Sequence, residues 1–127
     1  MQPRILEKKI EKIKHQLVGI SNLRPGSLST QYNTCGKKDC RCKADPPKKH
    51  GPYYQLSLTR KGKSQTKFIK QEAVPMVEAE IFNYRRMKEL MEKWIDLSIE
   101  LSNARLEQEF KKLNNNGRKR TQGAQRK

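Results

Sequence analysis

The sequence predicts an α+β protein, with an N-terminal helix, a small antiparallel sheet of two to three strands pinned by zinc, a long C-terminal helix and a disordered basic tail. Apolar residues recur at helical spacing towards both ends of the chain and alternate with polar residues in the middle, as in strands. Three cysteines and a histidine lie inside the strand region. The chain has 127 residues, 33% of them hydrophobic. A domain this small and polar is commonly stabilised by a metal or by a partner chain.

An N-terminal segment, residues 1–22, is expected to contain one amphipathic helix over residues 3–21. Its apolar residues are spaced by three and four and form one narrow stripe: Leu6, Ile10, Ile13, Leu17 and Ile20. The helix is expected to end near Gly19, because Pro25 and Gly26 follow in a stretch that is typical of a turn.

The next segment, residues 23–74, is expected to be a metal-binding β domain. Tyr54, Leu56 and Leu58 alternate with polar residues, which predicts a half-buried strand with these three on its packed face. A Gly-containing hairpin loop is expected at residues 60–63. The flanking strands are expected at residues 27–33 and 64–70.

A long helix is expected over residues 75–113. Pro75 is tolerated in a first helical turn, and no further Pro or Gly occurs before Gly117. The segment from 114 to 127 contains five Lys and Arg and no acid, and we expect it to be the disordered basic tail. As a coiled coil the helix is imperfect, because Lys88, Ser98 and Arg105 interrupt the heptad assignments.

The candidate metal ligands follow the pattern C-x4-C-x-C-x7-H and are Cys35, Cys40, Cys42 and His50. Three thiolates and one imidazole suit tetrahedral Zn²⁺ and complete a structural site. Reduced cysteines without metal are the alternative interpretation. An iron–sulfur cluster suits the residues less well, because the chain has no fourth cysteine.

The net charge of +16 is unevenly distributed along the chain. Residues 1–75 hold 17 Lys and Arg against 5 Asp and Glu, whereas residues 76–113 hold 7 against 8. Such asymmetry favours a nucleic-acid partner, DNA or RNA, over a basic surface without a polyanionic partner. The candidate nucleic-acid-binding residues are Lys37, Lys38, Arg41, Lys43, Lys48, Lys49, Tyr53, Arg60, Lys61, Lys63 and Lys67. Tyr53 is included because it is expected to face away from the side of the strand that Tyr54 shares with the leucines.

Several short runs resemble a family of small, uncharacterised prokaryotic proteins that is classed as a domain of unknown function. They include the stretch from Arg24 to Leu28, Tyr32, the run C-G-K-K-D-C-R-C from Cys35 to Cys42, and the H-G-P-Y run that begins at His50. The resemblance covers roughly residues 23–105. It implies a helix, a metal-pinned hairpin and a long helix in proteins often found near mobile elements, and it implies no activity.

We therefore expect a non-catalytic, zinc-containing nucleic-acid-binding protein. The alternative is a helical oligomerisation or adaptor protein for a mobile-element or nucleic-acid-processing complex, assembled as a homo-oligomer through the long helix. No catalytic residues are expected, because the metal site uses the thiols and the one histidine that nucleophilic catalysis would need. The sequence predicts neither a membrane span nor a signal peptide, so a cytoplasmic location is expected.

Overall fold

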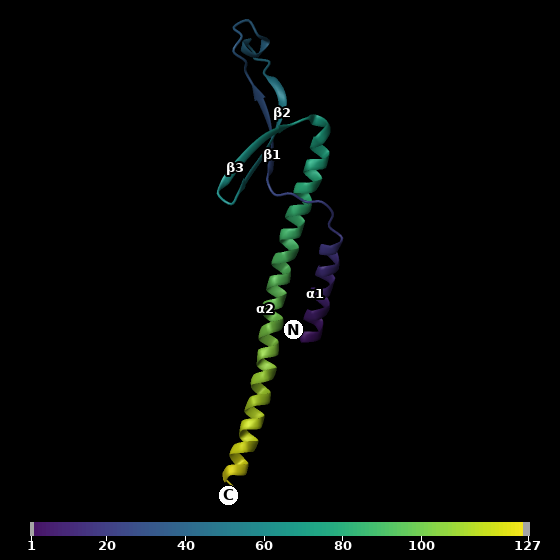
Figure 1. Ribbon diagram of the computed structural model, residues 1–127, viewed down its shortest axis with the longest axis vertical. Helices are drawn as coiled ribbons and strands as arrows, with labels where there is room; N and C mark the ends of the chain where they lie inside the picture. The colour runs from purple at the N-terminus through teal and green to yellow at the C-terminus, as the bar shows by residue number, and fades with distance from the viewer. Residues whose placement is uncertain (1, 126–127) are drawn as a thin grey trace. The chain divides into compact units, whose positions relative to one another are not determined.

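A computed structural model describes the backbone of residues 2–125 and the side chains of residues 2–116. The elements are α1 (Pro3–Val18), β1 (Ser27–Asn33), η1 (Arg41–Lys43), β2 (His50–Arg60), β3 (Lys63–Ile69), η2 (Gln71–Ala73) and α2 (Val74–Gln125). Figure 1 labels the two α-helices and the three strands. The predicted α+β class is confirmed. The contacts divide the chain into a sheet unit, residues 20–86, and a helical unit that combines the first helix with α2 from residue 87 onward.

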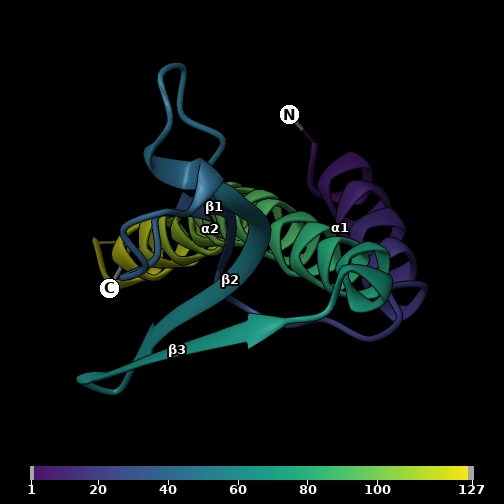
Figure 2. The ribbon, with the colours of Figure 1, turned by 90° about the horizontal axis from the view of Figure 1, so that it is seen from above.

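The sheet unit has three antiparallel strands in the order β1-β2-β3, with β2 in the centre (Figure 2). Leu28 of β1 lies opposite Leu56 of β2, and Leu56 in turn lies opposite Lys67 of β3. Lys61 and Gly62 join β2 to β3, and both have positive φ, 53° and 77°. Positive φ at both central residues is what a two-residue turn needs to match the twist of its flanking strands.

The core of the sheet unit forms where the first turns of α2 pack on one face of the sheet. Leu56, Val77 and Ile81 are the buried residues of this cluster, and Leu28 and Ile69 pack against it half-buried. Leu56 is only 3% exposed. The alternation in β2 therefore predicted the packed face correctly, and Leu56 is its most buried residue.

The helical unit buries the apolar stripe of α1 against α2. Leu6, Ile10 and Ile13 of α1 are buried, as is Leu90 of α2, which is 1% exposed. Lys14 lies over the ring of Trp94, with its Nζ 5.4 Å from the ring centroid. Periodicity alone identifies the α1 stripe, but it does not single out Leu90.

The ends of the two helices were predicted unequally well. Helix α1 ends at Val18 with Gly19 as its C-cap, in agreement with the end expected near Gly19. Helix α2 does not end at residue 113 and continues to Gln125. Asn and Gly are weak helix formers that cost at most about 1 kcal/mol each, and no proline follows them to break the helix. The side chains from residue 117 on, and residues 126–127, lie outside the described part, so the disordered basic tail stays a prediction there.

None of the helices in the described residues is both long enough and apolar enough to cross a membrane.

Candidate metal centre

The four predicted metal ligands all come from the segment that joins β1 to β2. Cys35 follows β1 by two residues, Cys40 caps the start of η1, and Cys42 lies within η1. His50 is the first residue of β2 and is paired with Asn33 of β1. Strand pairing thus brings His50 close to the first cysteine, and the short helix η1 folds the other two back between them.

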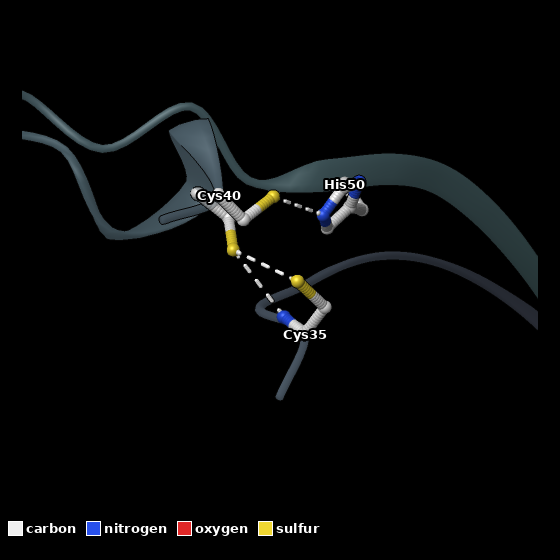
Figure 3. Close-up of side chains that lie close together, drawn as sticks. Cys35, Cys40 and His50 are labelled. Atoms are coloured by element: carbon white, nitrogen blue, oxygen red, sulfur yellow. Dashed lines mark hydrogen bonds between the residues drawn. The ribbon is translucent and has the colours of Figure 1, made fainter. Parts of the chain in front are cut away.

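The ligand atoms of Cys35, Cys40, Cys42 and His50 all lie within 4.8 Å of one another. The Sγ atoms of Cys35 and Cys42 are 3.7 Å apart, and the Sγ of Cys40 is 2.9 Å from Nε2 of His50. Figure 3 shows the Cys40 side chain pointing at the His50 ring. A zinc tetrahedron has a sulfur–sulfur edge of about 3.8 Å and a sulfur–nitrogen edge of about 3.5 Å. The four residues can therefore hold a tetrahedral metal ion if Cys40 and His50 move slightly apart and the most widely separated ligand atoms, up to 4.8 Å apart, move slightly together.

Backbone hydrogen bonds give the ligand loop its local shape. The N–H of Lys43 donates to the carbonyl of Cys40 at 3.0 Å, and the N–H of Lys48 donates to Arg41 at 3.0 Å. Gly51 follows His50 with φ +137°, and a Cβ there would lie 2.8 Å from the carbonyl oxygen of Gln31. A side chain at position 51 would therefore push β2 away from β1 beside the metal ligands.

The thiols differ in acidity. The pKa of Cys40 is lowered to about 6, chiefly because the backbone N–H of Cys42 donates to its sulfur, and then because of hydrogen bonds from the Cys35 and Cys42 side chains. The pKa of Cys35 is raised, because the lowering effect of the Lys37 backbone is outweighed by hydrogen bonding to Cys40 and by burial. A thiol with a lowered pKa is largely a thiolate near neutral pH, which is the form that binds metal.

The ligand loop has almost no apolar core of its own. Among residues 34–49, all of them described, Cys42 is the sole buried residue, at 1% exposure. A segment of this length with one buried side chain lacks the apolar contacts that normally order a loop. The shared position of the four ligand atoms is thus the main feature that can hold it together.

Six of the predicted nucleic-acid contacts lie on this same loop. All six side chains are exposed, and within the described residues none is ion-paired with an acid: Lys37, Lys38, Arg41, Lys43, Lys48 and Lys49. The loop also contains Asp39 and Asp45, which are exposed. We call these six residues the basic loop.

The remaining predicted contacts lie elsewhere in the sheet unit. Arg60, Lys61 and Lys63 surround the β2–β3 turn, at the far end of β2 from His50. Strand β2 has 11 residues, so the turn lies at most about 33 Å from His50, at about 3.3 Å per residue of extended strand. The basic loop and the turn are therefore two separate basic surfaces.

Tyr53 is on the opposite face of the sheet from the exposed cations of the hairpin. By strand alternation and pairing, Arg60, Lys63 and Lys67 share the face of Leu56, whereas Tyr53 shares the other face with Phe68. The rings of Tyr53 and Phe68 meet edge-to-face at 6.4 Å, and Phe68 is 60% exposed. Phe68 was not among the predicted contacts, although the residues two positions away on either side, Thr66 and Lys70, are polar and indicated an exposed strand face.

The fold and the ligand loop define a small α+β protein with a Cys3His cluster that can hold a metal ion. The chain belongs to the family described as a domain of unknown function (DUF6788), whose model matches residues 4–79. No curated protein and no solved structure matches the chain. The matched residues include α1, the whole sheet and the ligand loop, and they end shortly after the start of α2.

Proposed function

We propose that this chain is a non-catalytic, zinc-containing protein that binds nucleic acid through its basic loop. One observation carries the proposal: six exposed cations occupy residues 37–49, in a loop whose four candidate ligands lie within 4.8 Å of one another. A metal that holds this loop in one conformation also holds its cations in fixed positions. Cations in fixed positions can bind the regularly spaced phosphates of a nucleic-acid backbone.

Zinc is the metal that this ligand set favours. Thiolate and imidazole ligands in a tetrahedron are typical of structural zinc, whereas Mg²⁺ and Ca²⁺ prefer oxygen ligands. Four protein ligands leave no open coordination position for water or substrate, so the metal at this site would stabilise structure and not perform chemistry. For this reason we propose no catalytic role.

The two basic surfaces suggest how a long nucleic acid would be held. The basic loop provides the main contact, and the turn at Arg60, Lys61 and Lys63, at most about 33 Å away along β2, contacts phosphates further along the chain of the nucleic acid. A short oligonucleotide would reach one surface alone. Affinity is therefore expected to rise with ligand length until both surfaces are occupied.

Fluorescence anisotropy with the full, zinc-loaded chain tests the proposal. The probes are single- and double-stranded DNA and RNA of about 24 nucleotides, titrated at several salt concentrations, because each phosphate contact contributes about −0.9 to the salt slope for duplex DNA. A steep negative slope is expected. A flat salt response with all probes would contradict nucleic-acid binding.

A pair of charge-matched variants locates the contact. The loop variant carries Lys37→Gln, Lys38→Gln and Lys48→Gln, and its control carries Lys8→Gln, Lys9→Gln and Lys12→Gln on exposed positions of α1. Both lose three charges, but the loop variant alone is expected to lose affinity strongly and to reduce the salt slope by about 2–3. Equal losses in the two variants would mean that net charge, and not the basic loop, causes binding.

A further inference from the structure

Helix α2 carries a second apolar face in the helical unit, distinct from the face that meets α1. Leu90 is buried against α1, and Ile99 lies nine residues further on, which is two and a half turns and so the opposite side of the helix. Ile99 is 56% exposed. The exposed large apolar residues of this opposite side are Met91, Ile95, Ile99, Leu106, Phe110 and Leu113.

These residues follow a repeat of 11 residues. Starting from Met91, the spacing along the chain is four, four and three, and the same spacing recurs after Ser102. The complete series is Met91, Ile95, Ile99, Ser102, Leu106, Phe110 and Leu113. We call it the α2 stripe.

An 11-residue repeat has 3.67 residues per turn, close to the 3.6 of a straight helix. At about 100° per residue its members drift by about 20° in 11 residues, whereas heptad positions drift by about 20° in seven, so the stripe stays on one side of the helix. The same repeat explains why heptads fit this segment poorly. Ser98 and Arg105, which interrupt the heptads, lie beside the α2 stripe and not in it.

A shallow groove lies along the N-terminal half of the α2 stripe. Met91, Ile95, Ile99 and Ser102, together with Trp94 and Ser98, line most of a shallow, mainly apolar groove of about 430 Å³. The two serines have small side chains, so a groove of this kind can accept large side chains from a facing helix. The stripe spans 23 residues, or about 34 Å at 1.5 Å per residue.

We propose that the α2 stripe is the interface of a parallel homodimer, in which it packs on the same stripe of a second copy of this chain. Six large apolar side chains on one helix face form a larger apolar surface than single exposed residues do. Two copies of the stripe have the same length and the same repeat, so they can pair along their whole length. This inference does not depend on nucleic-acid binding, and it concerns residues beyond those that the family model matches.

The charges beside the stripe determine the direction of pairing. One flank carries the acidic residues Glu92, Asp96 and Glu107, whereas the other carries Arg105 and also Glu109, which is ion-paired with Lys112 at 3.7 Å. In a parallel pair each flank faces the opposite flank of the other copy, so Arg105 of one chain lies near Glu107 of the other. In an antiparallel pair each flank faces itself, which would bring the acidic side chains of the two copies together. The parallel arrangement is therefore favoured.

Light scattering after size exclusion measures the oligomeric state of the full chain. A mass of about 30 kDa is expected at high concentration, twice the 14.9 kDa of one chain, with dissociation on dilution. Ile99→Glu places a charge in the centre of the stripe and is expected to give a monomer. The matched control is Val18→Glu on α1, where Val18 is 84% exposed and outside the stripe, and it is expected to remain a dimer.

Two charge variants beside the stripe keep the test decisive if Ile99→Glu unfolds the chain. Arg105→Glu and Glu107→Arg are each expected to weaken association, by about threefold to tenfold, and the double variant is expected to restore it. Residues two apart do not face each other on one helix, so coupling between these two positions must arise between chains.

The outcomes separate the possibilities. A wild-type chain that stays monomeric up to about 1 mM, the weak end of the affinity scale, overturns the homodimer. A dimer that Ile99→Glu and Val18→Glu affect equally overturns the assignment to the α2 stripe. A dimer in which the Arg105 and Glu107 changes do not compensate overturns the parallel direction.

Discussion

Removing the metal is expected to unfold the ligand loop while leaving the helical unit intact. In the described structure, residues 35–50 contain four backbone hydrogen bonds, donated by Cys40, Lys43, Ala44 and Lys48, and one buried side chain, Cys42. Each such bond contributes about 1 kcal/mol net. Ordering these 16 residues costs at least about 16 kcal/mol of backbone entropy at about 1 kcal/mol each. The hydrogen bonds alone leave a deficit, which the roughly 10–16 kcal/mol of a structural zinc site is large enough to offset.

Hydrogen exchange measured by NMR tests this directly at the donating amides. With zinc bound, the N–H groups of Lys43, Ala44 and Lys48 are expected to exchange slowly, and after chelation they are expected to exchange at least about a thousandfold faster, equivalent to about 4 kcal/mol. Leu90 is the internal control, because it is buried within the helical unit, whereas the loop belongs to the sheet unit. Cys42→Ser should reproduce the effect of chelation, whereas Lys43→Gln, an exposed neighbour, should not.

One result would show that the metal does not hold the ligand loop. If metal analysis shows that the protein has lost its metal and these three amides remain protected, the loop is held by contacts other than the four ligands.

Two further predictions concern the sheet unit. Leu56→Ala removes one of the two most buried side chains of the core of the sheet unit and is expected to lower the free energy of unfolding, measured by urea titration, by about 2–3 kcal/mol. Leu58→Ala, at a half-buried position on the same strand face, should lower it by about 1 kcal/mol. Equal costs would contradict the assigned core. Gly51→Ala is expected to cost about 1–3 kcal/mol and to weaken metal binding, because its φ is +137° and the new Cβ would lie 2.8 Å from the Gln31 carbonyl oxygen. The control Gly36→Ala, which meets nothing within 4 Å, should change both thermal unfolding and zinc affinity little. A loss at position 36 equal to that at 51 would count against the steric argument.

The sequence alone determined the elements whose signals are local. The alternation around Leu56 predicted a strand and its packed face, the stripe from Leu6 to Ile13 predicted α1, and the strand at residues 27–33 has the bounds that were expected. The four candidate ligands also follow from residue type and spacing, because thiolates and an imidazole within 16 residues have few other structural uses. The structure confirms that these four lie close enough to hold a metal ion.

The end of α2 was not predictable in the same way. Asn114 and Gly117 indicated a stop, but weak helix formers stop a helix only if something favours another conformation there. No proline follows Asn114 to make the helical conformation unfavourable, and the helix continues to Gln125.

What only the tertiary structure decided is how the residues share surfaces. Strand pairing and the 11-residue length of β2 separate the basic loop from the turn at Arg60, although the sequence alone predicted their residues only as one set of nucleic-acid contacts. Pairing also places Tyr53 with Phe68 on the face opposite Lys67. In α2 the apolar residues look like one stripe in sequence, but packing with α1 buries Leu90 and leaves Ile99 exposed on the other side. Periodicity records which residues are apolar, and the physical partner of each face is decided by contacts between segments distant in the chain.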